Sequence, residues 1–369
     1  MGIHRATALL TVAALALAAC SSSSDSDEGS KPSGSSSASS KEPSPTDSGP
    51  DEITLAFAGD THFQDRVSHL ATDPDGLESL KPTLGAADFA MLNLETALTE
   101  RGAPIPKMIN FRAPASSLDT LDNAGIDIVS LANNHAVDYG PDGLEDTLEA
   151  KKDSPIPIVG IGADEDEAFE PAEVKRGNVS IGVIGATQVK EETLENYSAD
   201  ESNVGVASNL PTDRTVEEVK KMTKKYDLVV VYLHWGFDYQ NCPDERSIKA
   251  RKDLEEAGAD VIVGAHAHRF QGAGWSGKSY VGHGLGNFVW YSSRPYDKET
   301  GVLTLTVDAK KARAKRPADR TSTVVTEHEW TPMVVGDQGL PEEQNEAETE
   351  RLMQEWDNRR EYAGLDSTP

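Results

Sequence analysis

Short apolar runs alternate with longer amphipathic segments along most of the chain, and this alternation limits the possible folds more than any other feature. Seven runs have the length of a strand and many Val and Ile residues: Ile53–Ala58, Phe89–Leu94, Ile126–Leu131, Ile156–Ile161, Val179–Ile184, Leu228–Leu233 and Val261–Val263. Segments with helical spacing lie between most of them: Ala115–Asn123, Gly140–Lys152, Thr212–Lys225 and Asp244–Ala257. Strands that alternate with helices predict parallel β-sheet in an α/β fold.

The pattern changes after Gly272. Consecutive strands without helices between them are predicted at Ser279–Trp290, Val302–Val307 and Thr323–Val335, so this part is expected to be antiparallel. The basic run Lys310–Arg320 is predicted to form a solvated hairpin tip, and residues 341–361 a charged terminal helix.

The first 20 residues predict export. His4 and Arg5 precede an apolar run, Ala8–Ala19, which is too short to span a bilayer and typical of a signal-peptide core. Leu17-Ala18-Ala19-Cys20 resembles the bacterial lipobox, in which the cysteine receives a diacylglycerol. We therefore expect a signal peptide at 1–19 and a lipid at Cys20 that anchors the protein to the outer, extracytoplasmic face of the cytoplasmic membrane. The alternative is an ordinary signal peptide with a chance cysteine.

Composition supports a tether followed by one large domain. Residues 20–52 are rich in Ser with almost no large apolar side chains, and such a segment cannot offset its conformational entropy by burial. The expected organisation is a tether at 20–52, a domain at 53–340 and a helix and tail at 341–369. The formal net charge of −27 disfavours nucleic acid as a partner.

Polar side chains follow five of the predicted strands at their carboxyl ends. These residues are Asp60 and His62, Asn93 and Glu95, Asn134 and His135, His234, and His266 and His268. In an open α/β sheet these ends form the ligand crevice. Buried carboxylates and imidazoles without partners are costly, and both groups are ligands for Zn, Mn or Fe. The sequence therefore predicts a metal site at this edge.

The same residues, in the same order, carry a family resemblance. Asp60-x-His62, Asn134-His135 and His266-x-His268 resemble the motifs of the calcineurin-like metallophosphoesterases. More narrowly, the chain resembles the CapA family, named for poly-γ-glutamate capsule synthesis. The motifs for this are Gly59-Asp60, Asn93-Leu94-Glu95, Phe111-Arg112-Ala113-Pro114, Asn133-Asn134-His135-x-x-Asp138-Tyr139-Gly140, His234-Trp235-Gly236, Gly264-Ala265-His266-x-His268 and Leu285-Gly286-Asn287-Phe288.

The resemblance implies a four-layer α-β-β-α sandwich of metallophosphatase type with two divalent metal ions (Mn, Zn, Fe or Mg). Asp60, His62 and His268 would hold one metal, and Asn134, His234 and His266 the second. Glu95 would bridge the two ions, with Asn93 beside it, although the wider family has Asp at the bridging position. His135 would contact the substrate as the catalytic residue instead of binding metal.

Two further residues have alternative interpretations. Asp138 is either a partner that fixes an imidazole or a cap for the helix after Tyr139. Arg112 either clamps an anionic substrate or forms a surface ion pair.

Two functions remain open at this level. The first is a metal-dependent hydrolase of a phosphoester or an envelope polymer. The second is a non-hydrolytic component of capsule or envelope-polymer biosynthesis or export, with an anionic polymer such as poly-γ-glutamate as its partner.

Overall fold

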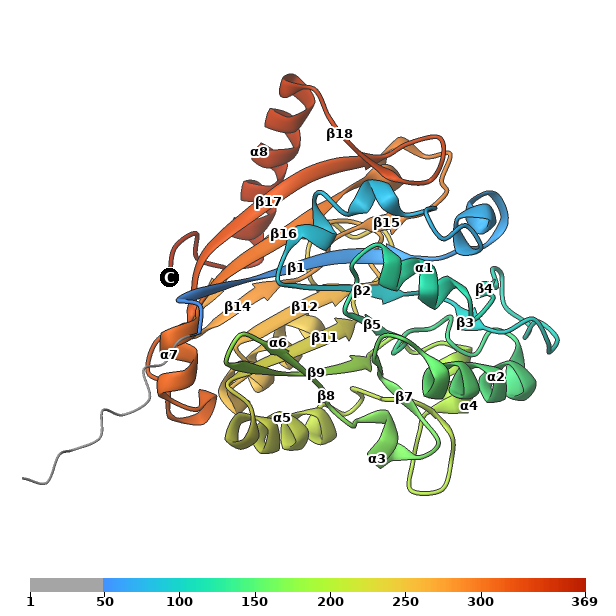
Figure 1. Ribbon diagram of the computed structural model, residues 1–369, viewed down its shortest axis with the longest axis horizontal. Coiled ribbons are helices and arrows are strands. Elements are labelled where there is room, and N and C mark those ends of the chain that lie inside the picture. Colours follow the sequence, from blue (N-terminus) through green and yellow to red (C-terminus); the bar gives the residue numbers. More distant parts are fainter. Residues whose placement is uncertain (1–48) are drawn as a thin grey trace, which may run out of the picture. The chain divides into compact units, whose positions relative to one another are not determined.

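Two β-sheets pack face to face, and helices cover the outer face of each (Figure 1). The computed structural model describes residues 49–369. Cys20, the predicted signal peptide and most of the predicted tether lie outside the described residues. Among the described residues, no helix is long and apolar enough to cross a membrane.

The first sheet has eight strands and contains both the first and the last strand of the described chain, β1 and β18. Its order is β18 (Pro341–Glu343), β17 (Val325–Val335), β16 (Glu299–Asp308), β1 (Glu52–Thr61), β2 (Phe89–Leu94), β5 (Ile128–Ser130) and β6 (Ile158–Val159), with β15 (Asn287–Val289) also paired to β1. The strands β1, β2, β5 and β6 run parallel, whereas β16, β17 and β18 run antiparallel.

The second sheet has six strands. Its order is β13 (Ala273–Ser276), β14 (Ser279–Gly282), β12 (Val261–Ala265), β11 (Leu228–His234), β9 (Val179–Thr187) and β8 (Ala172–Arg176). Two small ribbons join β10 (Gly205–Val206) to β7 (Ile161–Gly162) and β3 (Ala97–Leu98) to β4 (Arg112–Ala113).

The α-helices are α1 (Ser117–Asn123), α2 (Gly140–Asp153), α3 (Glu165–Ala168), α4 (Glu192–Tyr197), α5 (Asp213–Lys225), α6 (Glu245–Ala257), α7 (Ala309–Ala314) and α8 (Glu346–Tyr362). Short 3₁₀ helices are η1 (Asp65–Ala71), η2 (Glu78–Leu80), η3 (Leu84–Ala86), η4 (Pro295–Lys298) and η5 (Pro317–Asp319).

Three apolar cores separate the four layers. Side chains alternate between the two faces of a strand, so neighbouring residues of β11 enter different cores. Val230 packs with Phe57 of β1 in the core between the sheets, whereas Val231 packs with Leu254 of α6 on the outer face. Leu92 of β2 joins the third core, beneath α1 and α2. The predicted four-layer α-β-β-α sandwich is confirmed.

The prediction of a single strand at Ser279–Trp290 is wrong. Residues 283–286 leave the second sheet after β14, and the chain re-enters the first sheet as β15. Gly286 has φ of 77°, a left-handed conformation that interrupts a strand. Antiparallel pairing after Gly272, as expected, joins β13 to β14 and β16 to β17 and β18, whereas β14 and β15 each also have a parallel neighbour.

The segment Lys310–Arg320 does connect two antiparallel neighbours, β16 and β17, as the predicted hairpin tip requires, but it is folded into α7 and η5. The charged C-terminal helix exists as α8 and packs against β17 of the first sheet and β13 of the second. Trp356 stacks on Trp330 of β17 with ring centroids 4.1 Å apart, and Asp366 donates its backbone N–H to the Trp275 carbonyl over 2.8 Å.

Candidate metal centre

The strand-end residues of the two sheets meet where the carboxyl ends of β1 and β2 face those of β11 and β12. Asp60 of β1 accepts the backbone N–H of His266 from the other sheet at 3.1 Å. Tyr232 of β11 donates its hydroxyl to the Ala58 carbonyl at 2.6 Å. These bonds join the edges of the two sheets, so the site lies at the seam between them.

Asp60 is fully buried and has several donors around it. Asn93 donates to its Oδ1 over 2.9 Å, and His268 Nδ1 lies 3.3 Å from its Oδ2. Burial raises the pKa of Asp60, but hydrogen bonding and charge from His268 and the charge of His234 lower it, and the net shift is downward. The carboxylate is therefore held in the ionised form, which is the form that binds a metal.

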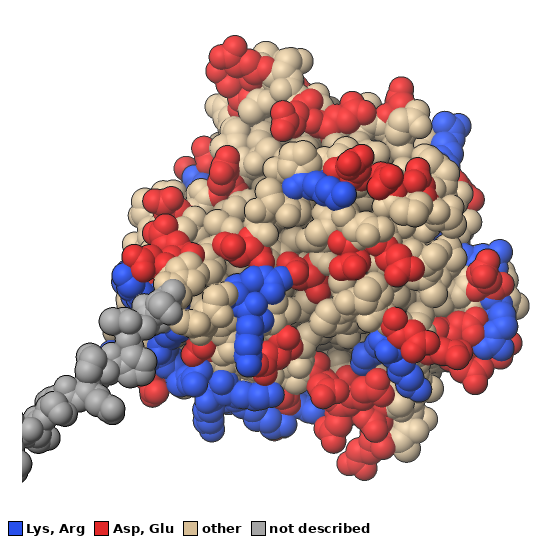
Figure 2. Space-filling model, in the orientation of Figure 1, with Lys and Arg blue, Asp and Glu red and all other residues tan. Residues whose placement is uncertain are grey.

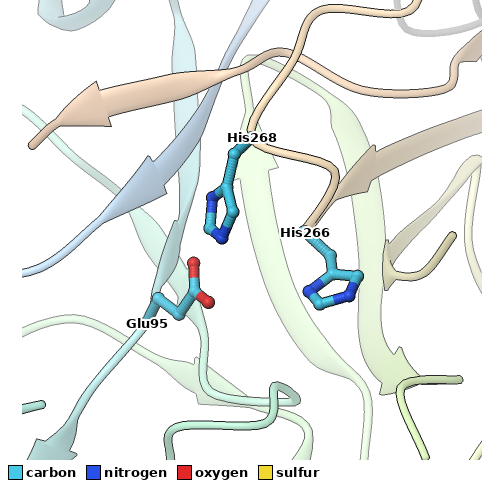
Figure 3. A group of neighbouring side chains, drawn as sticks. All are labelled: Glu95, His266 and His268. Carbon is cyan, nitrogen blue, oxygen red and sulfur yellow. The ribbon is translucent and has the colours of Figure 1, made fainter. Parts of the chain in front are cut away.

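Glu95 lies between two groups of possible metal ligands. One group is Glu95, His266 and His268, and the other is Asp60, Glu95 and His234; in each, the ligand atoms lie within 4.8 Å of one another. Figure 3 shows the Glu95 carboxylate directed at the space between the imidazoles of His266 and His268. Carboxylate and imidazole are ordinary ligands for Zn, Mn and Fe, so both groups could bind metal.

The hydrogen bonding of these residues fits a metal. Both carboxylate oxygens of Glu95 are buried and have no hydrogen-bond partner among the described residues. The same holds for Nδ1 of His234 and Nδ1 of His266 within residues 49–369. Buried polar atoms are nearly always paired, and leaving them unpaired costs about 1–3 kcal/mol each. Two bound cations, one in each group, would satisfy these four atoms.

The backbone around His266 and His268 has an unusual conformation. His266 has φ of 90° and His268 has φ of 53°, in a region that residues other than glycine rarely adopt. Strain of this kind persists where the surrounding structure requires it, often at functional sites. Two left-handed residues directly after β12 turn both imidazoles back toward Glu95.

Glycine is required beside Asp60. A Cβ on Gly59 would lie 1.8 Å from the carbonyl oxygen of Gly286. This close approach allows the Asp60 N–H to donate to that carbonyl over 2.9 Å. The Gly-Asp motif and the Gly-Asn motif before Phe288 are therefore two halves of one contact.

The loop after β5 supplies Asn134 and His135. Asn134 Oδ1 accepts from His234 Nε2 at 2.9 Å, which places the amide oxygen beside the second group. His135 Nε2 lies 3.8 Å from Glu95 Oε1. Its Nδ1 lies 2.5 Å from Asp138 Oδ2. Asp138 does not cap the helix after Tyr139, since its oxygens accept from Lys107, from the Phe111 backbone N–H and from His135.

Lys107, which the sequence motifs did not indicate, forms hydrogen bonds that hold this loop in place. Its Nζ donates to the Asn134 carbonyl at 2.8 Å and to Asp138 Oδ1 at 3.0 Å. Burial raises the pKa of Asp138 to about 6, against the opposing charge of Lys107. Burial, together with Lys107, lowers the pKa of His135 to about 3. At neutral pH the imidazole is therefore neutral, and its Nδ1–H donates to the Asp138 carboxylate.

His62 is buried beside the centre without joining either group of possible ligands. Its ring stacks on Phe111 with centroids 4.2 Å apart, and Trp290 packs edge-on at 4.2 Å. Its Nδ1 accepts the Gln64 backbone N–H at 3.0 Å. Burial lowers the pKa of His62 to about 3. The role of His62 as a metal ligand stays a prediction.

Arg112 is exposed and follows Phe111, whose ring contacts His62 and His135. Its guanidinium lies over the Tyr139 ring at 4.7 Å, and its backbone N–H donates to Gln64 Oε1. Together with Gln64 and Ser68 it lines a hollow of about 380 Å³. Arg112 takes part in no ion pair among the described residues, so its charge is available to an anion.

Sequence reasoning missed Asp238 as well as Lys107. Asp238 Oδ1 lies 3.4 Å from His266 Nε2, and burial raises the pKa of Asp238. Both residues lie in irregular loops where no periodic pattern marks them. The spacing of Asp238 four residues after His234 would have been the available signal.

Comparison with known sequences identifies the family. Residues 54–292 match the family described as bacterial capsule synthesis protein PGA_cap. The chain belongs to this family. The PGA biosynthesis protein CapA of Bacillus subtilis (strain 168) is 29% identical over 249 residues, which are 65% of this chain and 64% of that protein. The capsule biosynthesis protein CapA of Bacillus anthracis is 29% identical over 265 residues, 69% of this chain and 63% of that protein. The match thus spans somewhat less than two thirds of either relative.

Solved structures with some likeness include a phosphatase from Mycoplasma pneumoniae and the sulfate thiohydrolase SoxB of Thermus thermophilus. The first has a TM-score of 0.48 and 13% identity, and covers 82% of this chain and 96% of its own. The second has a TM-score of 0.41 and 15% identity, and covers 79% of this chain and 46% of its own.

Proposed function

We propose that this member of the capsule synthesis family is a metal-dependent hydrolase with two metal ions, which acts on a phosphoester or on an envelope polymer. One observation carries the proposal: Glu95 belongs to both groups of possible ligands, and both of its buried oxygens lack a hydrogen-bond partner among the described residues. A carboxylate in this position fits a bridge between two cations.

Asp60, Glu95 and His234 would hold one ion, and Glu95, His266 and His268 the other, with the Asn134 amide oxygen beside His234. This division differs from the one that the family resemblance implies, which places His268 with Asp60 and His266 with His234. Two ions of this kind activate water and neutralise charge on the group that is attacked. The residues of the chain supply orientation and proton transfer. Neutral His135, with Nδ1–H fixed on Asp138, keeps the lone pair of Nε2 directed toward the centre, where it can accept and return a proton. The exposed Arg112 would attract an anionic substrate.

A second candidate function follows from the relatives. Both Bacillus proteins are named for capsule or PGA biosynthesis. In this alternative the chain would be a non-hydrolytic component of envelope-polymer assembly that uses the metals and Arg112 to bind an anionic polymer such as poly-γ-glutamate. We also propose, on the sequence motif at Cys20, that the protein is lipid-anchored outside the cytoplasmic membrane.

Metal analysis combined with an activity assay tests the proposal. Residues 49–369 are loaded with Mn, Zn, Fe or Mg, assayed for bound metal, and supplied with phosphomonoesters, phosphodiesters and poly-γ-glutamate. The proposal expects about two bound ions per chain and hydrolysis with at least one metal. Asp60→Ala and His234→Ala should each lower bound metal and the melting temperature together, because a bound metal stabilises the native state.

His135→Ala separates the roles within the site. This variant should keep its metal and lose hydrolysis, whereas loss of metal would make His135 a ligand. His69→Ala, at an exposed position of η1, is the control and should change neither property. Metal binding without hydrolysis of any substrate would favour the assembly function, and no metal binding would refute the proposed centre.

A further inference from the structure

A group of basic side chains lies at the amino ends of the central strands, on a protein that is otherwise acidic. We name it the basic edge. It consists of residues from the end of α5 and from α7 and the segment that follows it: Lys220, Lys221, Lys224, Lys225, Lys310, Lys311, Lys315 and Arg316. Figure 2 shows Lys and Arg gathered there, while acidic side chains dominate the rest of this face. The formal net charge of the chain is −27, so the basic edge differs in sign from its surroundings.

The two parts of the basic edge are joined. Helix α5 packs against η5, and Arg316 Nη1 lies 2.6 Å from Asp227 Oδ1, directly after α5. Arg320 fixes the segment from inside: it is buried, pairs with Asp260 at 2.5 Å, and donates to the Ala312 carbonyl at 2.7 Å. The basic side chains are therefore presented by a fixed part of the fold.

Several of the charges are not neutralised locally. Lys221, Lys310, Lys311 and Arg316 each have a carboxylate partner. Lys220, Lys224 and Lys315 are exposed, and within residues 49–369 none of these three takes part in an ion pair. They remain available to an external anion.

The basic edge lies at the opposite end of the sheet from the metal centre. Strand β11 begins at Leu228, next to Asp227 and Arg316, and ends at His234 in the centre. Its 7 residues span roughly 20 Å at about 3.3 Å each. A surface that contacts the basic edge would leave the metal centre facing away from it.

The chain also enters the described domain at this end. Gly49 lies against Asn178, and Pro50 against Gly177, in the turn between β8 and β9. The next residue, Asp51, pairs with Lys310 at 2.7 Å and accepts the backbone N–H of Ala309. Anything attached upstream of Gly49 is therefore connected to the domain beside the basic edge.

We propose that the basic edge binds the anionic headgroups of a phospholipid membrane and orients the domain so that the metal centre faces away from the bilayer. Lys and Arg near an anionic bilayer each add favourable energy, and a polybasic surface beside a lipid anchor forms a second attachment. The alternative occupant, a soluble acidic polymer, does not explain why the charges gather where the chain enters the domain.

Vesicle sedimentation tests the proposal on residues 49–369, which contain both sheets and all three apolar cores and carry no lipid. This protein should bind vesicles that contain phosphatidylglycerol at low salt, and the binding should weaken as the salt concentration rises. It should not bind vesicles of pure phosphatidylcholine. Lys220→Glu, Lys224→Glu and Lys315→Glu combined should weaken binding at least tenfold. The matched control reverses Lys81, Lys152 and Lys252, which are exposed residues outside the basic edge with no ion pair within residues 49–369, and changes the net charge equally.

The outcomes are distinct. Loss of binding in the basic-edge variant with retention in the control supports the proposal. Equal loss in both variants, or no binding of the unaltered domain to anionic vesicles, refutes it. Tighter binding to soluble polyphosphate than to anionic vesicles would also refute it and assign the basic edge to an acidic polymer. Because none of these measurements involves metal or hydrolysis, their failure is distinguishable from failure of the proposed enzyme function.

Discussion

Replacing Lys107 with Met should destabilise the metal-free protein strongly and in a pH-dependent way. The Lys107 side chain is 7% exposed and its ammonium lies 3.0 Å from Asp138, whose side chain is fully buried. Removing one partner of a buried pair leaves the other charge uncompensated, at a cost of about 3–5 kcal/mol. We expect a loss of this size in the free energy of unfolding at pH 8.

The sign of the pH effect follows from Asp138. Burial raises its pKa to about 6 although Lys107 opposes the shift, so removal of Lys107 raises the pKa further. A carboxyl group whose pKa is raised in the folded state destabilises that state at pH values above the unfolded pKa. The penalty grows with pH until the folded pKa is reached, and it disappears at low pH, where both states are protonated. The cost of Lys107→Met should therefore be largest near pH 8 and decrease toward pH 5.

Urea denaturation with a chelator present, at pH 5 and pH 8, measures both effects. Lys151→Met is the control, because its pair with Glu167 is more exposed, with side chains 17% and 32% exposed, and should cost about 1 kcal/mol or less. Adding Asp138→Asn to Lys107→Met should restore much of the lost stability, since no charge is then left unpaired. A cost below about 1 kcal/mol at pH 8, or an equal cost at both pH values, would refute this account.

Three further predictions concern a buried histidine, the C-terminal helix and Arg112. Burial lowers the pKa of His283 to about 3, so below about pH 6.5 the unfolded chain takes up a proton that the folded chain does not, and stability is lost as pH falls. His283→Phe should reduce the slope of the unfolding free energy against pH, between pH 6 and pH 4, by about 1.4 kcal/mol per pH unit. Urea denaturation measures this slope. Trp356→Ala should cost about 3–5 kcal/mol by removing the stack on Trp330, and an unchanged melting temperature would contradict the packing of α8. Arg112→Ala should raise KM for an anionic substrate and leave kcat nearly unchanged, and a fall in kcat alone would show a different role.

The sequence predicts the parallel half of the fold well because periodicity and composition agree there. Runs such as Leu228–Leu233 are buried on both faces and flanked by amphipathic helices, so their identity as strands depends on local information. The run Ser279–Trp290 is less apolar, and its break depends on Gly286, whose left-handed conformation accompanies the contact with Gly59 in another strand. A long-range contact of this kind has no signature in a single segment.

The location of the site could be predicted for a similar reason, whereas the residues that hold its loops in place could not. Strand-end positions place Asp60 and Glu95 at the carboxyl edge of the first sheet and His234 at that of the second, and the two edges meet. Lys107 lies in a loop without periodicity, and only the three-dimensional fold brings it to Asp138 and Asn134. Its burial, which makes it important for stability, is not visible in the local sequence.

The motif that contains His62 does not determine whether this residue binds metal, and an experiment can decide it. The motif Asp60-x-His62 predicts a metal ligand, yet Nδ1 of His62 accepts the Gln64 N–H, which in a neutral imidazole leaves the proton on Nε2. Nε2 then has no lone pair for a metal, and the ring is held by Phe111, which stacks on it, and by Trp290, which packs edge-on. On this geometry we expect His62→Phe to keep its bound metal by elemental analysis, while His234→Ala, measured in parallel, loses it. Loss of metal in both variants would show that His62 binds metal through Nε2, and the ligand set implied by the motif would be the correct one.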